Sequence, residues 1–381
     1  MNEKQRYDTP LVKLAIERKL ITADQYEQCR ELVKKSRKIG LESTAEEVLV
    51  KQGFLREEEL QELSELVNLA EKGDFFGGYR LHKLIGKGGM GKVYEAVHEF
   101  TGRKVALKVL NTSFTRDGTN VTRFFQEIRA LAKLVSPHIV TLFDAGKAGR
   151  RYYFAMELVN GPSLDKYVTA KKLLTEREAL YITGRVARAL SLSHANNVIH
   201  RDVKPENILI NESGAPKVTD FGVVMHQDAD HLTLTQEGFM VGSVHFSSPE
   251  QVEGTRDIDG RSDIYSLGAT LYYMLTGRTV YSGKSSEEIL TKHLLGNWVS
   301  PRVYNPGVSP RTVRLVKRMM SRSRERRYQT MDEVAAEVDR ISVSHNIAAL
   351  VAAIAAGALS VLAGALFEHS LHIIDKLKLL P

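Results

Sequence analysis

The sequence predicts an α+β protein in which strands come first and helices follow. From Tyr79 the chain alternates in strand-like runs that are joined by glycine-rich or short turns. From about Ser163 helical patterns dominate, apart from short strands around Ile208 and Val218. A separate helical pattern precedes the first strands. The sequence therefore predicts more than one structural unit.

The composition is that of a folded, multidomain protein without disulfides. The chain has 381 residues, of which 43% are hydrophobic and 26% are charged, a balance typical of globular proteins. Its single cysteine, Cys29, excludes an intramolecular disulfide framework and a cluster of thiolate metal ligands. The net charge of +7 is spread along the chain, so we expect no nucleic acid as a partner.

Residues 1–74 are predicted to form a helical module that contains a repeat. "AIERKLITADQYEQC" (Ala15–Cys29) and "LVKQGFLREEELQEL" (Leu49–Leu63) share apolar, charged and turn positions at a shift of about 34 residues. Each copy reads as a short helix, a turn and a second helix. We interpret this segment as a packing or docking module whose partner is unknown, and the glycines of "EKGDFFGGYR" mark its end.

A glycine-rich turn lies between the first two strand-like runs. In "IGKGGMGKVYEA" the pattern is Gly86-x-Gly88-x-x-Gly91, and glycine allows backbone N–H groups to approach phosphate closely. The same spacing occurs in dinucleotide-binding turns, but those lead from a strand into a helix. The pattern therefore indicates a phosphate-binding hairpin, with an ordinary glycine-rich turn as the alternative.

A lysine and a glutamate are candidates for a functional ion pair. In "KVALKVL" the period of two places Ala106 and Lys108 on the same face of a strand. Glu127 lies at the edge of a predicted helical stripe in "RFFQEIRALAKLV". The stripe consists of Phe124, Ile128, Leu131 and Val135. An acid beside an apolar face needs a cation, so we predict that Glu127 pairs with Lys108; solvated side chains at both positions are the alternative.

The segment "VIHRDVKPENILI" (Val198–Ile210) places charged residues inside an apolar, β-branched run. Burying these charges is unfavourable unless they meet partners or a ligand. Asn207 follows Asp202 by five residues, and "DFG" begins at Asp220. Asn207 and Asp220 offer oxygen ligands that suit Mg²⁺, an ion that also binds nucleotide phosphates. The spacing predicts a site for ATP, Mg²⁺ and a hydroxyl nucleophile.

Together these motifs resemble the domain of eukaryotic-type (Hanks-type) bacterial serine/threonine protein kinases over residues 79–342. The resemblance implies a bilobal fold with a β-rich N-lobe and a helical C-lobe. It also implies transfer of the γ-phosphoryl group of ATP to Ser or Thr hydroxyls of protein substrates. Lys204, two residues after Asp202, favours this branch over tyrosine kinases.

The resemblance gives each candidate residue a role. Asp202 would accept the hydroxyl proton, and Lys204 would steady the transferring phosphoryl group. Lys108, paired with Glu127, would hold the α and β phosphates. The residues implied in Mg²⁺ binding are Asn207 and Asp220. Those implied in ATP binding, with Met156 as gatekeeper, are Ile85, Gly86, Gly88, Gly91, Val93, Ala106, Lys108, Met156, Glu157 and Val159.

Three positions near residue 245 depart from the family pattern. Ser243, Phe246 and Ser248 replace the usual Thr, Tyr and Ala. We expect the Ser243 hydroxyl to bind Asp202 and activity to survive. A pseudokinase that binds nucleotide without transfer is the main alternative. A small-molecule kinase is more distant, because that class generally lacks the long segment from Asp220 to Glu250.

The resemblance also implies structural pairs and a switch. We expect Glu250 to pair with Arg327 and Asp263 to bind the backbone of the catalytic loop. Arg201 precedes Asp202, as in kinases activated by a phosphate on the activation segment, and a phosphate can order a loop against a cation. The candidate phosphorylation sites are Thr233 and Thr235.

The C-terminal part predicts a membrane anchor. Residues 347–367 contain no charged side chain and are long enough to span a bilayer as one transmembrane helix, with residues 368–381 as a short tail. We expect a single-pass protein of the cell membrane with its kinase domain in the cytoplasm. Ala356, Ser360 and Gly364 form a small-residue face that would allow a homodimer. An Ala-rich helix buried against another domain is the alternative.

Overall fold

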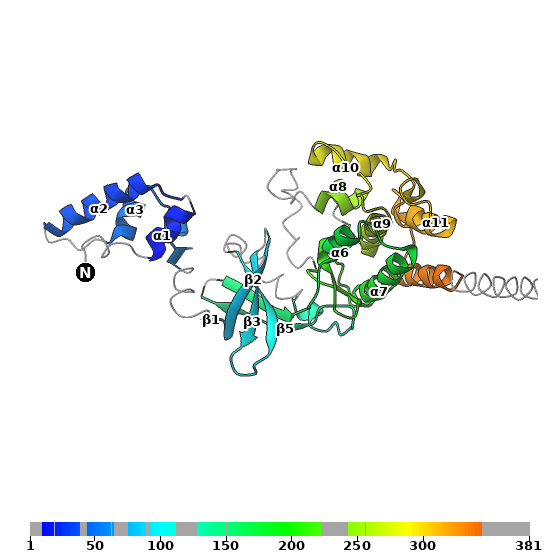
Figure 1. Ribbon diagram of the computed structural model, residues 1–381, viewed down its shortest axis with the longest axis horizontal. Coiled ribbons are helices and arrows are strands. Elements are labelled where there is room, and N and C mark those ends of the chain that lie inside the picture. The colour runs from blue at the N-terminus through cyan, green and yellow to red at the C-terminus, as the bar shows by residue number, and fades with distance from the viewer. Residues whose placement is uncertain are drawn as a thin grey trace, which may run out of the picture. The chain divides into compact units, whose positions relative to one another are not determined.

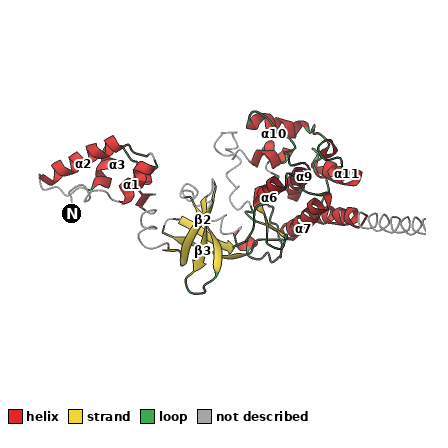
Figure 2. Cartoon of the chain, viewed as in Figure 1, coloured by secondary structure: helices red, strands yellow, loops and turns green. Residues whose placement is uncertain are grey.

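The computed structural model describes residues 10–18, 20–38, 44–61, 63–64, 75–88, 91–111, 128–149, 151–221, 243–255 and 257–344. Two compact units divide the chain. The first unit comprises residues 1–87, 91–109 and 146–153, and the second comprises residues 88–90, 110–145 and 154–381. Figure 1 labels the elements, and Figure 2 shows that helices dominate the second unit.

The first unit begins with three helices, α1 (Pro10–Glu17), α2 (Ala23–Lys38) and α3 (Ala45–Lys51), and residues 57–61 are also helical. Their apolar side chains form a core of their own. Its most buried members are Val12, Ala15, Cys29, Leu49, Leu55 and Leu63. Burial raises the pKa of the Cys29 thiol above its ordinary value.

The two halves of this helical segment make matching hydrogen bonds 34 residues apart. Leu20 N–H donates to the Ala15 carbonyl, and Phe54 N–H donates to the Leu49 carbonyl, both at 3.0 Å. The turn that follows is also closed in the same way in both halves. The Gln25 side chain accepts a hydrogen bond from the Thr22 N–H, and the Glu59 side chain accepts one from the Arg56 N–H. The interpretation of the segment as a docking module stays a prediction.

Six strands form one sheet in the order β1-β2-β3-β4-β6-β5. The strands are β1 (Phe75–Phe76), β2 (Tyr79–Gly88), β3 (Gly91–His98), β4 (Lys104–Leu110), β5 (Leu142–Ala148) and β6 (Arg151–Glu157). In the first unit Tyr153 packs edge-on against Phe76 and Tyr79, and its hydroxyl donates to the Gly77 carbonyl at 3.1 Å. The predicted hairpin around Thr101 is confirmed, since β3 and β4 are neighbours.

The second unit contains the long helices and a two-stranded sheet. Its helices are α6 (Leu164–Lys171), α7 (Glu176–Ala195), α8 (Pro249–Val252), α9 (Gly260–Thr276), α10 (Ser286–Leu295) and α11 (Pro310–Met319), followed by helical residues 331–344. Short 3₁₀ helices are η3 (Pro205–Asn207), η5 (Ser243–Phe246), η6 (Pro301–Val303) and η7 (Arg324–Arg326). Strands β7 (Ile208–Ile210) and β8 (Pro216–Val218) pair antiparallel, with Ile208 opposite Val218.

Helix α9 is the centre of this unit and packs against α7 and α11. Asp259 caps its first turn by accepting the Arg261 N–H at 2.9 Å. It ends at Gly277, which has φ +66°, and a Cβ at this position would lie 2.1 Å from the Lys172 carbonyl oxygen. Side chains such as Ile264, Leu267 and Leu271 are fully buried. Helix α9 is therefore a rigid base for the loops that it contacts.

The order of strands and helices predicted from the sequence is confirmed, but one predicted core position is wrong. Val135 is 82% exposed, and its neighbour Leu134, only 2% exposed, is buried instead. The helical residues end at 131 and a turn follows, so the helical period no longer applies at Val135. Several predictions fall outside the described residues. They concern Phe124, Glu127, Thr233, Thr235, residues 347–367 and the tail 368–381.

None of the helices in the described part of the chain is long and apolar enough to cross a membrane. The predicted span at 347–367 lies outside the described residues.

Candidate active site

The predicted catalytic residues Asp202 and Lys204 and the predicted Mg²⁺ ligand Asn207 lie together in the second unit. The Lys204 ammonium contacts Asp202 Oδ2 at 2.7 Å, and Asn207 Nδ2 donates to the same oxygen at 2.9 Å. Asn207 Nδ2 also donates to the Asp202 carbonyl at 2.8 Å. The Asp202 side chain is 17% exposed. Both donors hold one oxygen of the carboxylate, which leaves Oδ1 to accept a proton from a hydroxyl group.

His200 ties this loop to the strand that leads to Asp220. Its ring is fully buried, with Nε2 3.0 Å from the Thr219 carbonyl and Nδ1 3.2 Å from the Asp202 N–H. The ring nitrogens are therefore used as one donor and one acceptor, the pattern of a neutral imidazole. The ring also packs against Phe221, with centroids 4.6 Å apart. These contacts position Asp202 and Asp220 on adjoining segments.

Asp263 on α9 holds the backbone of the catalytic loop, as predicted. Its carboxylate accepts the His200 and Arg201 N–H groups at 2.9 and 2.8 Å, and it lies 2.7 Å from His194 Nε2. Burial acts to raise the pKa of Asp263, but the bonds from His194 and His200 outweigh burial and hold the pKa below its ordinary value of 3.8. Asp263 is thus a charged, buried anchor.

Arg201 adopts a left-handed conformation, with φ +64°, which is strained for a residue with a side chain. Both of its backbone polar groups are bound by side chains from elsewhere. Asp263 accepts its N–H, and Gln251 Nε2 donates to its carbonyl at 2.7 Å. The strained backbone beside Asp202 is therefore fixed by α8 and α9. Gln251 was not among the predicted residues.

Asn207 and Asp220 fit the chemistry of a Mg²⁺ site. Thr219 N–H donates to the Asn207 carbonyl at 2.9 Å, so the residue before Asp220 is bonded to Asn207. The amide NH₂ of Asn207 is used by Asp202, which leaves its amide oxygen as a ligand. Mg²⁺ is usually bound by one or two carboxylates together with substrate phosphates. Within the described residues no group of three or more His, Cys, Asp or Glu side chains could hold a metal ion.

The predicted hinge follows β6 in the second unit. The Glu157 carboxylate is fixed by Lys217, with Nζ 2.9 Å from Oε1, and its backbone N–H donates to Thr141. Gly161, two residues after Val159, has φ +149°, and a Cβ there would lie 1.9 Å from the Ile210 carbonyl oxygen. The hinge therefore lies directly on β7. Val159 is half-buried and is available to contact a ligand through its backbone.

Met156, the predicted gatekeeper, is half-buried at the end of β6. Its sulfur accepts a weak hydrogen bond from the Thr219 hydroxyl at 3.9 Å. It also lines a small cavity of about 40 Å³ together with Ile128 and Phe221. The gatekeeper thus contacts Thr219, the residue directly before Asp220.

The remaining ATP-binding candidates lie on strands β2, β3 and β4. Gly86 is on β2 opposite Val93 of β3, since a Cβ at Gly86 would lie 3.6 Å from the Val93 Cβ. Ile85 is 45% exposed on the same strand. Gly88 ends β2 and Gly91 begins β3. On β4, Ala106 is buried and Lys108 is half-buried. The Lys108–Glu127 pair stays a prediction because Glu127 is not described.

Glu250 and Arg327 form the predicted buried ion pair. Arg327 binds both carboxylate oxygens, at 2.6 and 2.8 Å, and donates to the carbonyls of Ser321, Arg261 and Arg322. Its side chain is fully buried. This geometry is the bidentate fork that makes Arg–carboxylate pairs strong. The pair fixes α8, which follows the segment containing Ser243.

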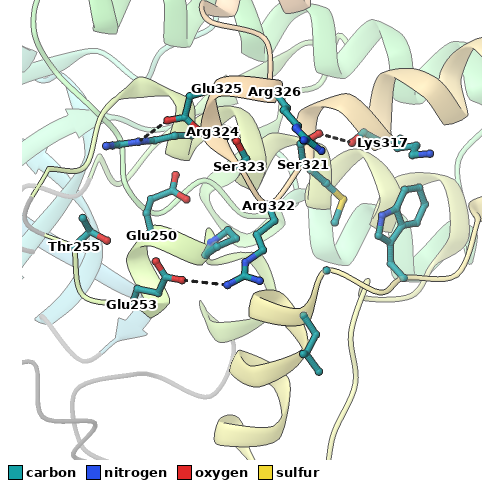
Figure 3. A pocket seen from close by; sticks show the side chains of 15 residues that line it. Glu250, Glu253, Thr255, Lys317, Ser321, Arg322, Ser323, Arg324, Glu325 and Arg326 are labelled. Atoms are coloured by element: carbon teal, nitrogen blue, oxygen red, sulfur yellow. Dashed lines mark hydrogen bonds and ion pairs between the residues drawn. The ribbon is translucent and has the colours of Figure 1, made fainter.

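A cavity of about 630 Å³ lies beside this pair (Figure 3). Figure 3 shows Arg322 directed at Glu253, at 3.8 Å, and Arg324 at Glu325, at 3.6 Å. Trp298 contributes to its apolar wall. No predicted site residue lines this cavity, so it is separate from the catalytic group.

The three departures from the family pattern are partly visible. Phe246 is 5% exposed and packs edge-on against Tyr273, with ring centroids 6.2 Å apart. Ser248 is fully buried at the start of α8, where its backbone N–H donates to Gln251 Oε1. Its hydroxyl forms a 2.5 Å hydrogen bond with the Ser262 hydroxyl. The Ser243 side chain lies outside the described part, so its bond to Asp202 stays a prediction. Ser248 thus supports α8 with a hydrogen bond that alanine could not make.

The sheet of the first unit and the catalytic loop of the second define the architecture of a protein kinase, with a sheet-bearing N-lobe and a helical C-lobe. Residues 79–338 match the protein kinase domain family, and the chain belongs to this family.

Known relatives are bacterial serine/threonine kinases. The chain is 36% identical over 262 residues to the serine/threonine-protein kinase PrkC of Bacillus subtilis, covering 69% of this chain and 40% of PrkC. It is 35% identical over 267 residues to PknB of Mycobacterium tuberculosis, covering 69% of this chain and 42% of PknB. A crystal structure of a mutant Mycobacterium tuberculosis PknI kinase domain superposes with a TM-score of 0.57 at 25% identity, over 70% of this chain and 97% of that domain.

Proposed function

We propose that this chain is an active serine/threonine protein kinase that transfers the γ-phosphoryl group of Mg²⁺-bound ATP to protein hydroxyls. The observation that carries this proposal is the shared oxygen of Asp202, bound by Lys204 at 2.7 Å and by Asn207 at 2.9 Å. Lysine at this position is the feature that favours Ser and Thr over Tyr acceptors. The relatives named above are serine/threonine kinases, which also supports this assignment.

The residues of the chain supply positioning, proton transfer and charge. Asp202 Oδ1 accepts a hydrogen bond from the substrate hydroxyl and takes its proton as the phosphoryl group is transferred. The Lys204 ammonium lies beside the same carboxylate and offsets negative charge on the γ-phosphoryl group during its transfer. Asn207 and Asp220 would hold Mg²⁺, which when bound neutralises phosphate charge. The fixed backbone at Arg201 holds the Asp202 and Lys204 side chains in position relative to each other.

Phosphate transfer by the full chain tests this proposal. Purified protein is incubated with Mg²⁺-ATP and a generic protein substrate, and the phosphorylated amino acids are identified. We expect phosphoserine or phosphothreonine, and a loss of at least about 100-fold in kcat for Asp202→Asn, because a general base contributes factors of this size. Nucleotide binding should change little.

The matched control is Asp24→Asn, which makes the same change at an exposed position in α2. It should keep wild-type turnover. Nucleotide binding by the wild-type chain without any transfer would contradict the proposal and favour the pseudokinase alternative. Phosphorylation of a free sugar or amine but of no protein would favour a small-molecule kinase.

We also propose that the kinase is anchored in the cell membrane by residues 347–367, with its catalytic part in the cytoplasm. The support is the uncharged, Ala- and Leu-rich sequence of this segment. Protein substrates, a homodimer and an unknown partner of residues 1–74 belong to the same proposal.

A further inference from the structure

A cationic groove lies between α7 and the helical residues 331–344, which run beside each other in the second unit (Figure 1). We call it the α7 groove. It has a volume of about 230 Å³. Its polar lining comes from Arg177, Tyr181, Arg185 and Arg188 of α7 and from Asp339 and Ser342. None of the predicted catalytic or ATP-binding residues lines it.

The charges of the groove are not balanced. Arg188 binds Asp339 at 2.6 Å, and both side chains stay about half exposed. The Arg185 guanidinium lies over the Tyr181 ring, 5.3 Å from its centroid. Within the described residues neither Arg177 nor Arg185 forms an ion pair. Three guanidinium groups therefore face one carboxylate, so the groove has the charge to bind an anion.

The groove is also shaped by a glycine inside a helix. Gly184 lies in the middle of α7, where glycine weakens a helix. A Cβ at Gly184 would lie 3.1 Å from Val338 Cγ1 and 3.4 Å from Arg188 Nη1. Arg188 Nη1 also donates to the Gly184 carbonyl at 3.2 Å. The glycine thus lets Arg188 lie close to the helix backbone, and Asp339 holds it there from the other side.

The position of the groove indicates which anion it meets. Ser342 lines the groove, and Arg311 donates a hydrogen bond to the Ser344 hydroxyl just beyond it. The uncharged segment 347–367 begins five residues after Ser342. Five residues span at most about 18 Å even when fully extended. If this segment enters a bilayer, the α7 groove adjoins the lipid headgroups, where anionic lipids attract Lys and Arg side chains.

We propose that the α7 groove binds the phosphate of an anionic phospholipid in the membrane that holds residues 347–367. This proposal rests on the proposed membrane anchor. Arg177 and Arg185 donate to the phosphate oxygens as charge-assisted hydrogen bonds, and Arg188 is already held in place for a third contact. Tyr181 has the amphipathic ring that suits a membrane interface. Headgroup binding would orient the kinase domain on the membrane surface.

The test measures which lipid lies next to position 181. The natural chain has a single tryptophan, Trp298. The full chain with both Trp298→Phe and Tyr181→Trp therefore carries one indole, which lies in the α7 groove. It is reconstituted into phosphatidylcholine vesicles containing nitroxide-labelled phosphatidylglycerol or, at the same mole fraction, nitroxide-labelled phosphatidylcholine. We expect at least twofold stronger fluorescence quenching by the labelled phosphatidylglycerol.

Two further variants test the role of the arginines. Arg177→Gln with Arg185→Gln should bring the quenching ratio to about one. The matched control, Lys284→Gln with Arg302→Gln, removes two exposed cations outside the groove and should leave the ratio unchanged. Retained protein phosphorylation by both double variants confirms that they are folded.

The outcomes separate the groove from the anchor. Equal quenching by the two labelled lipids, in a chain that resists alkaline extraction, would contradict lipid binding by the α7 groove but would still support the membrane anchor. A chain that is extracted at alkaline pH contradicts the anchor; a phosphatidylglycerol preference that still depends on Arg177 and Arg185 would then support the groove alone. If soluble glycerol phosphate changes the fluorescence as strongly in neutral vesicles, the ligand is a free phosphate, and the lipid assignment is wrong.

Discussion

At His293 the fold buries a titratable side chain outside the catalytic group. Its ring has no exposed surface, and Nδ1 lies 2.9 Å from the Tyr265 hydroxyl. Among the residues that the structure describes, none forms a hydrogen bond with Nε2. Burial, followed by the charge of His245, lowers the pKa of His293 to about 4. His293 is therefore neutral in the folded protein throughout the physiological pH range.

This pKa predicts a loss of stability in mild acid. The unfolded side chain binds a proton near pH 6.5, whereas the folded one binds it near pH 4, so between these values the unfolded state binds more protons. The contribution of His293 is fully present above pH 6.5 and is lost as the pH falls towards 4. At pH 5 the loss should be about 2 kcal/mol in the free energy of unfolding.

Urea unfolding at pH 7 and pH 5 measures this loss. His293→Asn keeps an acceptor for Tyr265 but cannot titrate, so the difference between the two pH values should shrink by about 2 kcal/mol. His82→Asn, an exposed histidine on β2, is the control and should leave the difference unchanged. An identical acid dependence in wild type and His293→Asn would show that His293 does not carry the effect.

At the scale of elements, the Glu250–Arg327 pair connects α8 to the loop that contains η7. The Arg327 side chain is fully buried and that of Glu250 is 9% exposed. Removing one partner leaves an uncompensated buried charge, so Arg327→Met should lower the free energy of unfolding by about 3–5 kcal/mol. Adding Glu250→Gln removes the orphaned charge and should recover part of this loss.

A double-mutant cycle in chemical denaturation measures the coupling between the two side chains. The exposed pair of Lys292 and Glu288 is a fitting control, because Glu288→Gln should change stability by less than about 1 kcal/mol. A value for Arg327→Met within that same range would contradict the assigned role of the buried pair.

Local patterns in the sequence predicted the elements and the catalytic group, and the family motifs also predicted two long-range contacts, Glu250 with Arg327 and Asp263 with the catalytic loop. Long-range contacts of residues outside these motifs were not predictable. Asp202, Asn207 and Asp263 were found because fixed motif spacing reflects fixed chemistry. The bonds from Gln251 to Arg201 and from His194 to Asp263 join residues 50 and 69 positions apart, and no sequence period relates such positions.

The one signal for Gln251 that the sequence does offer is local. Ser248 and Gln251 have the spacing of a helix capping box, and the structure forms that box at the start of α8. Val135 was misplaced for the opposite reason, since a periodic pattern does not show where a helix ends. The sequence thus predicts residue positions best where a short functional motif or a regular hydrophobic period covers them.

At the scale of the whole molecule, the chain joins a kinase domain to a predicted anchor and a helical repeat. Arg201, beside Asp202, has its backbone fixed by α8 and α9. We predict that its side chain pairs with a phosphate on the activation segment. The segment carries Thr233 and Thr235. In residues 347–367 the small-residue face of Ala356, Ser360 and Gly364 would allow two chains to pair. Two paired chains would hold each activation segment near the partner's catalytic group.

This arrangement predicts phosphorylation between chains that depends on the anchor. Asp202→Asn protein cannot label itself, so any phosphate on it comes from an active partner when the two are co-expressed. We expect phosphate at Thr233 or Thr235 of the inactive chain by mass spectrometry, and at least several-fold less when both chains end at residue 344, because tethering raises the effective concentration. Replacing Gly364 by Leu in both chains should reduce the labelling without releasing the protein from the membrane, since a bulky side chain blocks close helix packing. An activation segment that stays unmodified beside a fully active enzyme would show that this kinase needs no such switch.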